Sequence, residues 1–484
     1  MKRLIFSFML FVTLGMAAGT SQAAGILTPT GSKYKPVEIR DHHVNVVINN
    51  GFAMTEVHQT FYNPNADNLE AVYSFPLPKS ASLSEVTIYA GEREINGEVL
   101  EKQKARQIYQ DEKSRGNDTG LAEKNEFYTF DFKVYPVPAR DETKIRFLYY
   151  QPLKIENGIG RYLYPLEDGG TDEAGMSFWT NNARVENTFT MNLELKSAYQ
   201  VQDVRTPGFE AAAQIDRLTE GHLKLDMQLS DFTLNRDFIF YYRLENGLPG
   251  RIEVLPYRAD SSEDGTFMMV ITPGVDLKPL ANGADYCFVL DVSGSMQSKL
   301  HTLKKGVMNS IEKLQVGDRY RFIAFSSQAG EDKTYVSDFK FPDLDTDNPE
   351  LERLWALATI EKLEAHARIG QIPPAESETA IKDLGLSYQI VTDYTSMVVL
   401  SDSAFADRGI QRLNQQRTAR EHQARAIRSQ QPVKSHRVDD KKPAFKFKAP
   451  SLGGGGGAID PLGGGLTLLF STIAAVRLLI RKRK

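Results

Sequence analysis

The sequence has almost no cysteine: Cys287 is the single one in 484 residues. One thiol cannot form an internal disulfide, so folding must depend on the packing of a core. Cys287 lies in an apolar run, and we interpret it as a small buried hydrophobic residue rather than a reactive thiol. No Cys/His spacing typical of a zinc site occurs, and a Cys–His hydrolase is disfavoured for the same reason.

The sequence also lacks a strong charge of either sign. Lys and Arg number 58 against 62 for Asp and Glu, which argues against nucleic acid as the main partner. The G-x-S-x-G elbow of many hydrolases is missing, and the eight histidines form no recognisable nucleophile–base pattern. We therefore expect a protein that is not an enzyme.

The N-terminal residues 1–24 have the pattern of a secretory signal peptide. Lys2 and Arg3 precede the apolar run 4–18, and the small residues at 21–24 would suit cleavage. The alternative, a membrane helix, is disfavoured because the run is short. We expect an exported mature chain that begins near Ala24 or Gly25.

Short alternating apolar runs between residues 35 and 150 predict β-strands, for example at 44–48, which precedes a hairpin-type turn at 49–51. A helical pattern at 100–113 interrupts them. The pattern predicts an antiparallel β-sandwich with one inserted helix. Further strands at 155–275 predict a β-rich extension packed on this sandwich.

Five segments of this region resemble the VIT domain, the module that precedes the A domain in inter-alpha-trypsin inhibitor heavy chains and in vault-associated and bacterial proteins. They occur in the family's order at residues 51–61, 73–78, 97–102, 105–109 and 134–139. The resemblance covers about 115 residues. It implies a VIT domain at 25–154, whose polar residues we interpret as turn and surface positions rather than catalytic groups.

The apolar run 286–290 ends in a D-x-S-x-S motif formed by Asp291, Ser293 and Ser295. A buried strand would deliver one carboxylate and two hydroxyls to a loop, and such hard oxygen ligands suit Mg²⁺. The motif resembles the metal-ion-dependent adhesion site (MIDAS) of von Willebrand factor type A domains. The resemblance implies a bound Mg²⁺ that accepts an acidic side chain from a protein ligand; alternatively, Asp291 and the serines cap a helix.

The rest of an A domain does not follow. Strand, helix and strand patterns at 285–327 predict the opening of a doubly wound sheet, but the family's Thr and Asp from two later loops cannot be found. Residues 355–360 and 388–399 are instead similar to a region beyond the A domain of VIT proteins. We interpret this as an internal deletion, or alternatively as a naturally compact variant, and expect the helix 350–367 and the strand 388–400 to cover exposed sheet faces.

The acidic run Asp343, Asp345 and Asp347 could suggest calcium. An EF-hand loop would need Gly at Asn348 and Glu at Leu354, so we predict an acidic turn before a helix instead.

The C-terminal part is polar and basic and then becomes rich in glycine. Residues 402–436 have too few apolar positions for a core face and predict a solvated helix or stalk, followed by a linker. The order at 453–484 is a glycine motif, the apolar run 466–480 and a basic end. It resembles the tripartite sorting tails of bacterial surface proteins and predicts either a transmembrane anchor, with its end in the cytoplasm, or cleavage by a sorting protease.

The predicted fold is mainly β with an α/β part: a VIT sandwich, then a partial doubly wound A-type domain and a helical C-terminal region. The predicted segments are a signal peptide at 1–24, VIT at 25–154, the β-rich extension at 155–275, the partial A domain at 284–340, a helix and strand at 341–402, a basic stalk or linker at 403–452 and the membrane tail at 453–484. We expect an envelope protein for adhesion or protein–protein interaction; the alternatives are a metal-independent scaffold and, less favoured, an envelope hydrolase.

Overall fold

The computed structural model describes residues 26–31, 33–78, 80–124, 129–156, 158–166, 184–234, 236–248, 250–272, 274, 285–290, 319–324 and 339–440. The chain divides into two compact units. Unit 1 comprises Met1–Asn246, Glu253–Val270 and Lys340–His436, and unit 2 comprises Gly247–Ile252, Ile271–Phe339 and Arg437–Lys484. Unit 1 is thus assembled from segments on both sides of an insertion.

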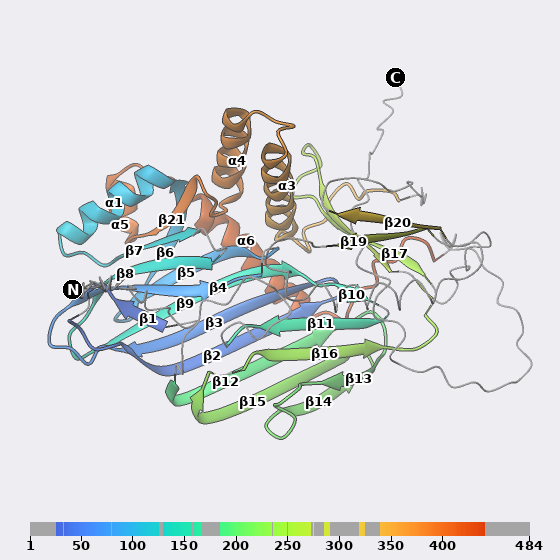
Figure 1. Ribbon diagram of the computed structural model, residues 1–484, viewed down its shortest axis with the longest axis horizontal. Helices are drawn as coiled ribbons and strands as arrows, with labels where there is room; N and C mark the ends of the chain where they lie inside the picture. Colours follow the sequence, from blue (N-terminus) through green and yellow to red (C-terminus); the bar gives the residue numbers. More distant parts are fainter. Residues whose placement is uncertain are drawn as a thin grey trace, which may run out of the picture. The chain divides into compact units, whose positions relative to one another are not determined.

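A 13-stranded sheet forms the main layer of unit 1 (Figure 1). Alternating buried and half-buried residues along β2 and β3 show the period of two that a strand requires. The strands from the first 152 residues are β1 (Ile26–Pro29), β2 (Glu38–Asn49), β3 (Phe52–Tyr62), β4 (Leu69–Pro76), β5 (Ser82–Ala90), β6 (Arg93–Glu101), β7 (Thr119–Lys124), β8 (Thr129–Val137) and β9 (Glu142–Pro152).

Strands from the predicted extension continue this sheet. They are β12 (Arg184–Lys196), β14 (Gln214–Thr219) and β15 (His222–Thr233). β12 pairs with β2 in parallel, whereas the antiparallel sandwich was predicted only for residues 35–150. A parallel pair is possible here because β2 and β12 are far apart in the sequence, which leaves room for a crossover connection.

A second sheet of four strands lies on one face of the large sheet. Its order is β10-β11-β16-β13, and the strands are β10 (Ile155–Glu156), β11 (Ile159–Tyr164), β13 (Val201–Arg205) and β16 (Phe238–Leu244). Tyr162 of β11 lies within 2.8 Å of Thr55 of β3, oxygen to oxygen, and both residues are buried. The extension therefore supplies the second layer of the sandwich as well as part of the first.

The core of this sandwich contains a buried chain of polar contacts. His42 lies 2.9 Å from the hydroxyl of Tyr164 and 3.1 Å from the side-chain amide nitrogen of Gln59. The Tyr73 hydroxyl donates to the carbonyl oxygen of Gln59. Burial, followed by the neighbouring His43, lowers the pKa of His42 to about 3, so the ring is neutral at ordinary pH.

β21 (Thr395–Val399) is the last strand of the large sheet in sequence order, and it lies between β6 and β7. It pairs antiparallel with both neighbours. Helix α1 (Lys102–Ser114) packs on this part of the sheet, and Tyr109 of α1 contributes to one apolar cluster with Val398 and Leu400. The VIT-like region is therefore completed by a strand from nearly 300 residues further along the chain.

The position of β21 corrects the sequence analysis. Residues 388–400 were predicted to form a strand that covers the A-type segment, but Tyr388 ends helix α4 (Pro374–Tyr388) and the strand begins only at Thr395. Gln389 adopts a left-handed conformation with φ of 57° and ends the helix. The predicted helix at 350–367 is confirmed as α3 (Leu351–Arg368), which pairs with α4 in unit 1.

The chain leaves unit 1 and returns to it at closely spaced points. β17 (Arg251–Tyr257) pairs with β18 (Thr266–Thr272), which leads into the insertion. After the insertion, Phe341 contacts Phe267, with 6.3 Å between ring centroids, and Asp345 forms a two-hydrogen-bond bridge with Arg258. The acidic run of residues 343–347 contains two bends and the bridge at Asp345, and a turn at residues 349–350 leads into α3.

In unit 2, β19 (Asp285–Leu290) and β20 (Arg319–Ala324) form a parallel pair. This pairing agrees with the predicted strand–helix–strand opening of a doubly wound sheet. Within the described residues no helix is long and apolar enough to cross a membrane. The predicted signal peptide at 1–24 and the tail at 453–484 lie outside those residues.

Candidate functional site

The residues predicted to hold a metal, Asp291, Ser293 and Ser295, lie outside the described residues. Strand β19 ends at Leu290, directly before Asp291. Among the residues that are described, no group of three or more His, Cys, Asp or Glu side chains could hold a metal ion. A different candidate lies where residues 413–429, which follow the insertion in the chain, contact the large sheet of unit 1.

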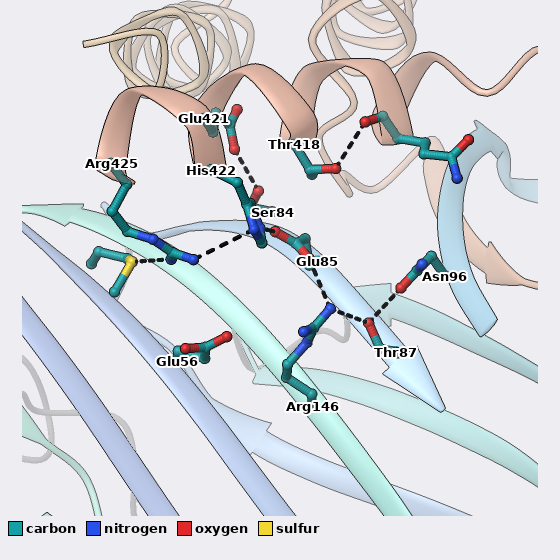
Figure 2. Close-up of polar contacts among 12 residues, drawn as sticks. Glu56, Ser84, Glu85, Thr87, Asn96, Arg146, Thr418, Glu421, His422 and Arg425 are labelled. Atoms are coloured by element: carbon teal, nitrogen blue, oxygen red, sulfur yellow. Dashed lines mark hydrogen bonds and ion pairs between the residues drawn. The ribbon is translucent and has the colours of Figure 1, made fainter. Parts of the chain in front are cut away.

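We define this candidate, the α6 seam, as the contact between helix α6 (Leu413–Ser429) and the outer face of β5, β6 and β9 (Figures 1 and 2). The short helix α5 (Asp402–Asp407) precedes it. The sequence analysis predicted a solvated helix or stalk here. The structure instead buries five residues of α6, namely Asn414, Arg417, Thr418, Glu421 and Ala424.

Glu98 of β6 holds the beginning of α6. Its carboxylate accepts hydrogen bonds from the backbone N–H groups of Asn414 at 2.6 Å and Gln415 at 3.1 Å. Arg412 completes the arrangement with an ion pair at 3.0 Å. A carboxylate at this end of a helix satisfies free N–H groups and interacts favourably with the helix dipole.

The centre of the seam is a buried ion pair. Arg353 of α3 contacts Glu421 of α6 at 2.6 Å, and both side chains are 0% exposed. Arg353 also donates to the side chain of Asn414 and to the carbonyl oxygens of Tyr388 and Gln389, while Glu421 accepts from Ser84 of β5 at 2.9 Å. This group ties α3, α4 and α6 to the sheet.

A small polar cavity of about 220 Å³ opens beside α6. Figure 2 shows Arg146 of β9 beside Glu85, at 3.3 Å, and Glu85 in contact with His422 of α6. Arg146 also lies 3.4 Å from Glu94. Arg425 of α6 lies 3.5 Å from the second ring nitrogen of His422. Both nitrogens of His422 are thus engaged, which leaves neither available as a general base in this arrangement.

Two carboxyl groups near the seam have pKa values that are shifted in opposite directions. The hydrogen bond from His58 holds the pKa of Glu56 below its usual value, and the nearby Arg425 and Arg146 act in the same direction. Burial raises the pKa of Glu350, which Arg428 of α6 contacts at 2.6 Å. The first carboxylate is stabilised by neighbouring donors and charges, whereas the second is destabilised by loss of water.

Sequence reasoning missed the seam because it searched for apolar periodicity. The buried positions 414, 417, 421 and 424 do recur at helical spacing, but all except Ala424 carry polar side chains. A search for polar residues at the same spacing would have found the pattern without identifying its partners. Those partners come from strands and helices distant in sequence.

Residues 39–149 match the family model of the VIT domain, the vault protein inter-alpha-trypsin domain. The chain therefore contains a VIT domain, as the resemblance predicted, and the structure shows the mainly β fold expected with it.

Among its relatives are proteins with VIT and A-type similarity. The chain is 25% identical to human inter-alpha-trypsin inhibitor heavy chain H3 over 323 residues, which cover 62% of this chain and 33% of that protein. It is 28% identical to mouse protein mono-ADP-ribosyltransferase PARP4 over 130 residues, or 27% of this chain and 7% of the relative. A von Willebrand factor A domain-containing protein from Dictyostelium discoideum is 23% identical over 28% of this chain and 15% of its own length. The chain thus spans only a third or less of these relatives.

Proposed function

We propose that this protein is exported, is held at the cell envelope and binds another protein through unit 1. The VIT domain and the relatives with A-type similarity support a role in protein–protein interaction. The signal-like pattern at 1–24 and the tail pattern at 453–484 support export and anchoring.

The observation that carries the proposal is the closure of the VIT sheet by β21. Since β21 lies between β6 and β7, a strand that follows the A-type segment in the chain completes the sheet of unit 1. The two points at which the insertion begins and ends are held together by two contacts. The ring of Phe267 contacts that of Phe341, and Arg258 forms a backbone bridge with Asp345. Unit 1 can therefore serve as a scaffold whether or not the insertion is a complete A domain.

Replacing residues 275–338 with a short Gly/Ser linker tests this proposal. We expect unit 1 to keep its melting temperature to within about 3 °C, since the described strands of this segment, β19 and β20, belong to unit 2. Cells carrying either the full chain or the replacement would then be treated with an amine-reactive crosslinker. The same crosslinked protein should be recovered with both forms, and its loss with the replacement would contradict a binding role for unit 1.

A second candidate is Mg²⁺-dependent adhesion through Asp291, Ser293 and Ser295. It is favoured by the parallel pairing of β19 and β20, because loops at the carboxyl ends of parallel strands are the usual ligand sites of doubly wound sheets. It predicts that chelation of divalent ions and Asp291→Ala both abolish the crosslink. Asp343→Ala, which removes an exposed acidic residue of unit 1, is the matched control.

Export and anchoring can be tested separately in the same cells. External protease should degrade the protein in intact cells, and the membrane fraction should retain it in high salt. Removing residues 453–484 should release it from that fraction; a chain protected inside intact cells would contradict export. Cleavage by a sorting protease would be seen as a mature mass that lacks these residues.

A transferase activity is not carried over from PARP4, because the match covers only 7% of that protein. We propose that the chain is not an enzyme. A broad hydrolase screen that detects turnover by the purified protein would instead favour the envelope hydrolase.

A further inference from the structure

Helix α6 is attached to unit 1 mainly through polar groups. Four of its five buried residues are polar, and Ala424 is the one apolar member. By contrast, all five residues of β21 are buried within a hydrogen-bonded ladder, and three of them, Met397, Val398 and Val399, are apolar. The two elements belong to the same returning segment but are held by different forces.

Ion pairs occur at both ends and in the centre of α6. Glu98 and Arg412 hold its beginning, Arg353 and Glu421 its middle, and Glu350 and Arg428 its end. Arg417 adds a contact with Glu352 of α3 at 2.5 Å. Each pair gains Coulomb energy in the docked state but loses the hydration of two charges, and these two quantities largely cancel.

The undocked helix would also be compatible with water. Its sequence contains four arginines and three glutamines, so release exposes polar side chains and one alanine rather than an apolar stripe. On the sheet, Glu85 and Arg146 contact each other and would remain paired after His422 leaves. The sheet beneath α6 thus presents the charged Glu85 and Arg146 together with Met54, which Arg425 contacts.

We propose that α6 is a releasable strap, which detaches as one unit from the outer face of β5, β6 and β9 while the sheet stays folded. Such low-stability units are opened by local fluctuations well below the free energy of global unfolding. Release would uncover Glu85, Arg146 and the surrounding polar face as a second surface of unit 1. This inference does not depend on the proposed function.

Hydrogen–deuterium exchange on the full-length protein, read by mass spectrometry, tests the strap. Amides in residues 413–429 should exchange at least about 100-fold faster than amides in residues 395–399, because the strap opens without the ladder. Glu98→Gln, which weakens the hold on the N-terminal end of α6, should speed exchange of 413–429 by about 10-fold or more and leave 395–399 unchanged.

A second variant and a matched control accompany it. Arg417→Gln breaks the ion pair with Glu352 without touching the sheet and should also speed exchange of α6 alone. Arg420→Gln changes an exposed arginine on the same helix and should leave both segments unchanged. Equal protection of α6 and β21 in the unaltered protein, or a parallel increase in both segments in the two variants, would overturn the proposal.

Discussion

Strand β21 and helix α6 both follow the insertion in the chain. β21 is a strand of the large sheet and α6 packs on the same sheet, yet the two are held by different interactions. β21 supplies two ladders of backbone hydrogen bonds and apolar side chains, whereas α6 supplies ion pairs and one buried alanine. Burial of apolar surface is favourable without any particular partner, while a buried charge is tolerated only with its partner in place. The burial of an element alone therefore does not reveal how firmly it is held.

The largest expected effect is on β21. Val398→Asp places an unpaired charge between β6 and β7, where Val398 is 0% exposed. We expect a loss of more than about 4 kcal/mol in the free energy of unfolding, so that unit 1 unfolds at 37 °C. Circular dichroism and urea titration would measure it. A folded variant with a loss below about 1 kcal/mol would contradict the central position of β21.

The next effect is in the α6 seam. Glu421→Gln leaves Arg353 buried without its charge partner and should lower the free energy of unfolding by about 3–5 kcal/mol. Urea denaturation measures the change, with the exposed Glu378→Gln of α4 as the control. If both variants behave alike, the buried ion pair does not hold the helix.

A double variant removes both charges of the buried ion pair between Arg353 and Glu421. We expect Arg353→Met with Glu421→Leu to be at least about 2 kcal/mol more stable than Glu421→Gln, because no charge is left unpaired. The lost hydrogen bonds to Ser84 and to the carbonyl oxygens of Tyr388 and Gln389 limit the recovery. A double variant less stable than the single one would mean that these hydrogen bonds outweigh the desolvation of the pair.

The smallest effect concerns a buried polar residue that carries no charge. The pKa of His42 is about 3 in the folded state against the ordinary 6.5 of an exposed histidine, so the unfolded chain binds the extra proton between these pH values. The contribution of neutral His42 to the free energy of unfolding is complete above pH 6.5. It is lost as the pH falls towards 3, by about 1.4 kcal/mol per pH unit. Unfolding titrations between pH 7 and 5 should show this slope, and His42→Gln should reduce it.

His366→Gln, in the last turn of α3 and outside the sandwich core, is the control for that experiment. An unchanged slope in His42→Gln would assign the pH dependence to other groups.

Much of unit 1 follows from local patterns. The predicted strand at 44–48 lies within β2, and the predicted helix at 100–113 matches α1. These elements were predictable because alternation and helical periodicity depend on near neighbours. The partners of β21 and the parallel pairing of β12 were not, since register between distant strands depends on the whole sheet.

Local sequence patterns established that a VIT domain is present and that its core forms without a disulfide, and they predicted the strands that pair in parallel as β19 and β20. The tertiary structure alone decided that residues 395–399 complete the VIT sheet and that a charged helix is partly buried. Local patterns depend on neighbours in the chain, whereas the place of a charge in the interior depends on a partner that folding brings from far away.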